Sequence, residues 1–147
     1  DKPVGDEYGW YEGGGWEWSK TDYAANALAV PNRPLCRKIG DFLDGTSNTA
    51  LLGEKALHPK NYETGTWYWD EPYFTGGSGG TQRNGSAVLR NSTTMESSFQ
   101  YNWGSDHSGG VMFVRADGSV GPVRHGTPPE KVKAFLTPMG GETGPEF

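Results

Sequence analysis

Two segments of the chain carry residue types that can support chemistry. His107 is followed, after nine intervening residues, by Asp117-Gly118, and an oxygen-rich run from Asp44 to Thr49 precedes Glu54. A histidine beside a carboxylate can act as a general acid–base pair or bind a metal ion. Both activities require the side chains to meet, so the elements between them decide which chemistry is available.

The residues between His107 and Asp117 predict a strand that keeps these two side chains apart. Residues 111–116 and 119–124 flank Asp117-Gly118, a two-residue signal for a type I′ β-hairpin. A strand over 111–116 extends about 20 Å at roughly 3.3 Å per residue. We therefore expect His107 to lock the loop before the strand through a backbone group or a carboxylate, and Asp117 and Gly118 to supply the turn.

The same turn predicts which face of the hairpin is buried. With Asp117-Gly118 as the central pair, Met112 faces Val123 and Val114 faces Gly121, so these residues are expected on the core face. The opposite face carries Val111, Phe113, Arg115, Val120, Pro122 and Arg124. Pro122 indicates that the second strand is an edge, because proline cannot donate a ladder hydrogen bond.

A short amphipathic helix is predicted after the hairpin. Thr127-Pro128-Pro129-Glu130 fits a capping box with proline at the first helical position. Val132, Phe135 and Leu136 then follow at helical spacing, and Pro138 ends the pattern.

The segment from Asp44 to Thr49 is typical of a turn and equally offers ligands for a hard cation. We favour the turn, formed by Asp44, Gly45, Thr46, Ser47, Asn48 and Thr49. The alternative is a Ca²⁺ site with Asp41, Asp44, Asn48 and Glu54 as ligands. Glu54 lies in the apolar stretch 50–57, which we expect to be a strand, and a buried ion pair with Arg37 or Lys38 is its other interpretation.

The remaining segments are less regular. Residues 1–22 predict an ordered loop with short extended pieces, residues 66–73 a strand, residues 75–98 a long loop and residues 140–144 a flexible tail. Cys36 is the only cysteine, and we expect it to be a small buried hydrophobe.

Composition limits the class of protein. The chain has 147 residues, which suits a single domain, and its net charge of −5 without a basic run argues against nucleic-acid binding. Nucleotide-loop and hydrolase motifs are absent from the sequence, so we expect no enzymatic activity. Aliphatic residues are few, so the tryptophans are expected mainly in the core. The alternative is a set of exposed platforms that stack on sugars, formed by Trp10, Trp16, Trp18, Trp67 and Trp69.

The two motif segments resemble the bacterial prepilin-type H-x9-D-G family. The resemblance rests on residues 103–120 and 44–54, is extended by residues 22–26 and Gly140-Gly141-Glu142, and covers residues 20–142, with 1–19 unplaced and 143–147 left as a tail. Members of the family usually begin with a cleaved pilin signal and a long apolar helix, neither of which occurs in this sequence. Some pseudopilins of similar architecture hold a calcium ion.

The resemblance implies a pilin-like globular head of α+β class, mainly antiparallel sheet with short helices and long loops. It implies a non-catalytic exported subunit of a pilin-like filament or a type II secretion-like pseudopilus, at the cell surface, outside the cell or in the periplasm. Its partners would be copies of itself or other pilin-like subunits, and the membrane would be reached only through the missing helix. The alternative function is a carbohydrate-binding surface module that recognises polysaccharide. No cofactor other than Ca²⁺ is expected.

Overall fold

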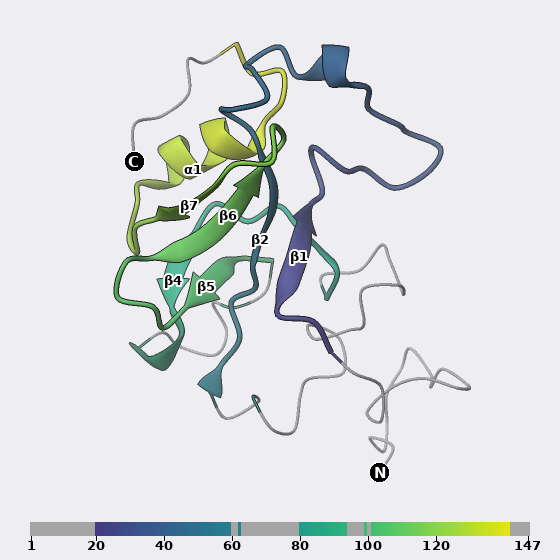
Figure 1. The fold of residues 1–147 in the computed structure, drawn as a ribbon. Helices are drawn as coiled ribbons and strands as arrows, with labels where there is room; N and C mark the ends of the chain where they lie inside the picture. The colour runs from purple at the N-terminus through teal and green to yellow at the C-terminus, as the bar shows by residue number, and fades with distance from the viewer. Residues whose placement is uncertain (1–19, 60–61, 63–79, 94–98, 100, 142–147) are drawn as a thin grey trace, which may run out of the picture.

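The computed structural model describes residues 20–59, 62, 80–93, 99 and 101–141 (Figure 1). The main sheet has the strand order β3-β1-β2-β6-β7, and β4 and β5 form a second, two-stranded parallel sheet. In the main sheet only the β1–β3 pair is parallel. The strands are β1 (Tyr23–Asn26), β2 (Ala50–Glu54), β3 (Gln82–Arg83), β4 (Val88–Arg90), β5 (Trp103–Ser105), β6 (Val111–Arg115) and β7 (Val120–Val123). The expected α+β class with a mainly antiparallel sheet is confirmed.

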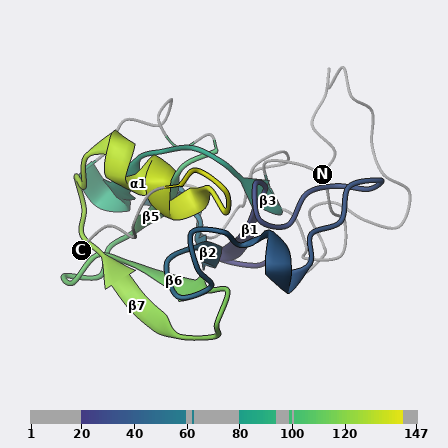
Figure 2. The same cartoon turned by 90° about the horizontal axis from the view of Figure 1, so that it is seen from above.

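The helical elements are short. The helix α1 (Pro129–Leu136) follows β7, and two 3₁₀ turns, η1 (Ile39–Asp41) and η3 (Asn91–Thr93), lie in connecting segments. Figure 2 shows α1 lying over the main sheet. Within the described ranges, no helix combines the length and the apolar character that crossing a bilayer requires.

The core lies between the main sheet and α1. The Trp103 and Phe113 ring centroids are 5.1 Å apart, and Phe113 meets Phe135 of α1 edge-on at 5.4 Å. Val132, Phe135 and Leu136 are buried, which confirms the predicted apolar face of the helix. The predicted capping box is wrong, because Pro128 is the N-cap residue and makes no side-chain cap hydrogen bond. The Thr127 hydroxyl instead donates to the Arg124 carbonyl at 2.7 Å.

The hairpin forms with a register one residue away from the predicted one. Val111 pairs with Val123 and Phe113 with Gly121, so the connection has three residues, with Gly118 at a φ of +86°. This geometry corresponds to a three-residue loop that ends in a left-handed glycine, which Asp-Gly supports as well as the two-residue turn. The shift exchanges the two faces of β6 but not those of β7. Val111 and Phe113 are therefore buried in place of the expected Met112 and Val114, whereas Val123 is buried as expected. The strand β7 is an edge, as expected from Pro122.

Three other expectations require correction. Residues 80–93 belong to the segment predicted as a long loop, but they contain β3, β4 and η3. Gly140 and Gly141 were expected in a flexible tail, but their amides donate to the Asp44 carboxylate, which fixes their position. Cys36 is exposed rather than buried, because it lies in the irregular connection between β1 and β2. The predictions for residues 1–19, 66–73 and 143–147 lie outside the described residues.

Gly53 in β2 permits close packing of the aromatic core. A Cβ atom at this position would lie 2.5 Å from Phe113 Cε1 and 2.8 Å from Trp103 Cε3. Both rings are buried and held by their neighbours, so neither can move away cheaply. The absence of a side chain at Gly53 thus lets the aromatic core rest directly on the sheet.

We therefore expect Gly53→Ala to lower the free energy of unfolding by about 1–3 kcal/mol through overpacking. Gly40→Ala is the matched control, because a Cβ at Gly40 would meet nothing within 4 Å. Urea denaturation of both variants measures the difference. Equal midpoints for Gly53→Ala and the unmodified chain would contradict this packing.

Candidate functional site

The two motif segments lie at opposite ends of one antiparallel ladder. The strands β2 and β6 pair through Ala50–Arg115, Leu52–Val114 and Gly53–Phe113, with a bulge between Ala50 and Leu52. The chain before β6 therefore meets the end of β2, and the turn after β6 meets the segment that leads into β2. His107 and Asp117 flank β6 on its two sides, as predicted, and do not form one dyad.

At the first end, Glu54 joins the His107 loop to the start of β6. His107 Nε2 donates to Glu54 Oε1 at 3.0 Å, and the Met112 amide donates to Glu54 Oε2 at 2.7 Å. The His107 carbonyl also accepts hydrogen bonds from His125 Nε2 at 2.9 Å and from the Gly110 amide at 3.2 Å. The prediction that His107 locks this loop through a carboxylate is confirmed. The proposed ion pair of Glu54 with Arg37 or Lys38 is wrong.

At the second end, the segment from Asp44 to Thr49 holds the hairpin turn. The amides of Ala116 and Asp117 donate to the Thr49 and Thr46 carbonyls at 2.9 and 3.1 Å. Within the segment, the Thr49 hydroxyl donates to the Gly45 carbonyl at 3.1 Å, and Gly45 has a φ of +96°. The favoured interpretation of this segment as a turn is confirmed.

The same turn also holds the segment of Gly140 and Gly141 after α1. Both oxygens of Asp44 accept an amide hydrogen bond at 2.7 Å, from Gly141 and Gly140. The Asn48 amide group donates to the Asp44 carbonyl at 2.9 Å, while Ser47 is exposed. Within the hairpin connection, Asp117 Oδ1 accepts the Ser119 amide at 2.9 Å, and this hydrogen bond lowers the pKa of Asp117.

The residues proposed as calcium ligands are not gathered into one site. Asp41 accepts the Lys38 amide at the start of η1, and Asp44 binds the amides of Gly140 and Gly141. Glu54 lies at the far end of β2 from both. Among the described residues there is no group of three or more His, Cys, Asp or Glu side chains that could hold a metal ion. Asp41, Asp44, Asn48 and Glu54 are therefore corrected from a ligand set to separate structural contacts. The five tryptophans proposed to stack on sugars lie outside the described residues.

Two buried polar side chains without a recognisable motif complete the framework. Asn26 at the end of β1 is fully buried, and its amide group donates to the Ala50 carbonyl at 2.8 Å and to the Leu136 carbonyl at 2.7 Å. It thereby links β1, β2 and α1. Arg83 is equally buried and donates to the carbonyls of Ala56, Phe99 and Asn102. Nothing in their local sequence distinguishes them from surface residues.

An open cleft of about 490 Å³ lies at the Glu54 end of the ladder. Its lining residues are Asp22, Tyr23, Glu54, Lys55, Leu57, Tyr62, Asn91, Gly104, Ser105, Asp106 and His107. They come from the start of β1, from the end of β2 and the segment after it, from η3, and from β5 and the loop after it, so the cleft collects distant parts of the sequence. Three carboxylates and one buried lysine are among them, and the ammonium group of this lysine donates to the Gly80 carbonyl at 3.0 Å.

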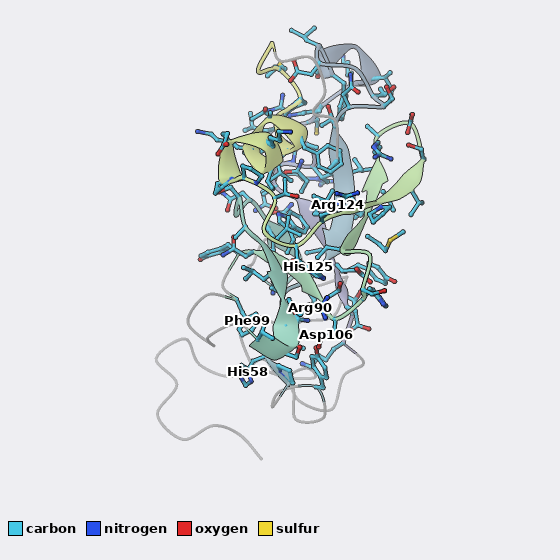
Figure 3. The ribbon with its side chains drawn as sticks, turned by 90° about the vertical axis from the view of Figure 1, so that its left-hand side faces the viewer. His58, Arg90, Phe99, Asp106, Arg124 and His125 are labelled. Atoms are coloured by element: carbon cyan, nitrogen blue, oxygen red, sulfur yellow. The ribbon has the colours of Figure 1, made fainter. Side chains whose placement is uncertain are left out.

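Asp106 is the best-connected carboxylate in this cleft. It accepts the Ser92 hydroxyl at 2.7 Å and the Ser92 amide at 2.9 Å, and the Tyr62 hydroxyl donates to it at 3.3 Å. The Ser92 hydroxyl contributes most to lowering the pKa of Asp106, and the charge of Arg90 acts in the same direction (Figure 3). Burial raises the pKa of Tyr62, and the Asp106 charge adds to this effect, so the phenol remains a donor.

Stability should therefore depend on the ionisation of Asp106. Because its pKa lies below the ordinary 3.8, ionised Asp106 stabilises the fold above that pH, and this contribution is lost as the pH falls through the lowered value. We expect Asp106→Asn to cost about 1 kcal/mol or less at neutral pH, since the site is exposed, and the difference from the unmodified chain to vanish at acid pH. Urea denaturation across this pH range measures it, and a difference that grows on acidification would contradict the assignment.

Comparison with known proteins places the chain in a family. No curated protein and no solved structure matches it significantly. Residues 4–130 match the family model described as "Protein of unknown function (DUF1559)". This match includes both motif segments, the β2–β6 ladder and the residues around the cleft, and it covers well over half of the sequence. The chain therefore belongs to the DUF1559 family.

Proposed function

We propose that this chain is the globular head of an exported pilin-like or pseudopilin-like subunit, with a role in assembly rather than in catalysis. The finer relationship to the prepilin-type H-x9-D-G family is part of the proposal. It is supported by the His107-x9-Asp117-Gly118 spacing, by the Asp44–Thr49 segment and by the mainly antiparallel α+β fold. The subunit would act at the cell surface, outside the cell or in the periplasm, as part of a filament or a type II secretion-like pseudopilus.

An exposed apolar segment is the observation that carries this proposal. Residues 30–43, which we call the arm, connect β1 to the turn before β2 and include η1 (Figure 1). Leu35, Ile39 and Leu43 are 67%, 72% and 73% exposed. Met139 is also exposed, and its sulfur accepts a hydrogen bond from Arg37 Nη1 of the arm at 3.6 Å. Large apolar side chains left exposed within one segment suit a protein–protein contact site.

The roles of the motif residues support assembly over catalysis. Both oxygens of Glu54 are occupied, one by the His107 imidazole and the other by the Met112 amide. The two hydrogen bonds fix the orientation of this carboxylate, so it can hold the loop before β6 in place. Asp117 is turned toward the Ser119 amide at the hairpin tip. His107, Glu54 and Asp117 thus each have a structural contact that accounts for their residue type.

We expect the chain to self-associate with rising concentration, and Ile39→Asp combined with Leu43→Asp to abolish this association. Burial of one such side chain contributes about 1.5–3 kcal/mol, and a buried carboxylate reverses the gain. Val120→Asp is the matched control, because Val120 is 59% exposed on β7 and outside the arm. Sedimentation velocity over a concentration series gives the result. A chain that remains monomeric throughout, or a double variant that associates like the unmodified chain, would contradict the proposal.

A further inference from the structure

We infer that the cleft beside Glu54 binds the arm of a second copy of this chain, so that copies join head to tail. This inference rests on the proposed assembly function and names the partner and the geometry of the contact. Three observations carry it: the charges of the arm and the cleft, the side chains available for contact, and the positions of the two surfaces on the fold.

The arm and the cleft have opposite charges. The arm contains three basic residues, Arg33, Arg37 and Lys38, against one carboxylate, Asp41, and therefore has a formal net charge of +2 in a chain of net charge −5. The cleft has three carboxylates and one lysine, so its formal charge is −2 with His107 neutral. Complementary potentials of this kind direct encounter and fix orientation at protein interfaces.

The cleft also contains side chains that can bind both cationic and apolar groups. Tyr23 and Tyr62 line it and are 53% and 52% exposed, so their rings are open to contact. A guanidinium or ammonium group over such a ring gains about 0.5–1 kcal/mol at an exposed site. The exposed carboxylate of Asp22 adjoins Tyr23 in the chain. An arm with Arg33, Leu35, Lys38 and Ile39 at its surface matches this combination of rings and carboxylates.

The two surfaces lie at opposite ends of the same pair of strands. In the β1–β2 ladder, Tyr23 pairs with Glu54, and both residues line the cleft. The arm instead leaves from the Asn26 end of β1 and returns at the Ala50 end of β2, at the top of the view in Figure 1. A contact between different surfaces at opposite ends is heterologous, and it propagates into a filament unless the rotation closes a ring.

Hydrogen bonds hold the arm at the end of the molecule from which it leaves, so its exposed side chains are available to a neighbouring copy. Arg37 Nε donates to the Leu28 carbonyl at 2.6 Å, and Gln82 Nε2 donates to the Val30 carbonyl at 2.7 Å. The arm returns to the body through Asp44, which binds the amides of Gly140 and Gly141. An arm held at these points does not reach the cleft of its own copy. A pre-ordered arm also loses less conformational entropy on binding.

Two complementary variants test this inference. The arm variant carries Arg33→Glu and Lys38→Glu, and the cleft variant carries Asp22→Lys and Tyr23→Ala, all at exposed side chains. The controls repeat the charge changes on α1, as Lys131→Glu with Lys133→Glu and as Glu130→Lys, where the side chains are also exposed. Circular dichroism and thermal unfolding establish that every variant is folded before association is measured.

Sedimentation velocity is recorded for each variant alone and for an equimolar mixture, at about 50 mM and about 500 mM NaCl. We expect each variant alone to remain monomeric and both controls to associate like the unmodified chain. The mixture should form dimers and nothing larger, because it contains one intact arm and one intact cleft for each pair. High salt should weaken this dimer at least about tenfold, as expected for an interface with complementary charges.

Other outcomes overturn the inference in distinguishable ways. A cleft variant that associates like the unmodified chain would show that the arm docks elsewhere. If Ile39→Asp with Leu43→Asp still abolished association in that case, the proposed assembly function would stand and only the cleft would be rejected. A mixture that remains monomeric would reject a head-to-tail contact. Absence of association in the unmodified chain would reject both proposals.

Discussion

The fold depends on a carboxylate that joins one end of the central ladder. Glu54 ends β2, and its two oxygens bind the His107 imidazole and the amide of Met112 in β6. The opposite end of the ladder is closed by backbone hydrogen bonds from Ala116 and Asp117 to the Thr46–Thr49 turn. Between these ends, Gly53 lets Phe113 and Trp103 lie against the sheet. The spacing of nine residues between His107 and Asp117 thus corresponds to the strand β6 and the short connections on either side of it.

The elements with local signals could be predicted from the sequence. The hairpin, a strand within residues 50–57 and the apolar face of α1 all follow from turn chemistry and residue pattern, although the strand ends at Glu54. The register of the hairpin could not be predicted, because Asp-Gly supports both a two-residue turn and a three-residue loop with a left-handed glycine. The prediction of the helix N-cap was wrong for a similar reason. Thr127 has the right type for an N-cap, but the two prolines begin the helix one residue later.

The candidate site could be predicted only in part. Residue type and spacing indicate His107, Glu54 and the Asp44–Thr49 turn, and they predict a backbone group or a carboxylate as the partner of His107. The identity of this partner depends on the antiparallel pairing of β2 with β6, which joins residues more than fifty positions apart. Asn26 and Arg83 are buried by tertiary packing, and nothing local distinguishes them from surface residues. The cleft is likewise assembled from three strands, η3 and the segments beside them, so only the fold reveals it.

If the motif residues have a structural role, the function depends on the surface of the molecule. The Glu54–His107 contact is then the interaction that most needs a test. The most direct measurement is a double-mutant cycle on the free energy of unfolding with Glu54→Ala, His107→Ala and the double variant. The account predicts a coupling free energy of about 0.5–1 kcal/mol, because each residue stabilises the fold through the other. Strictly additive effects, with a coupling below about 0.3 kcal/mol, would contradict the claim that this motif is a clamp on the ladder.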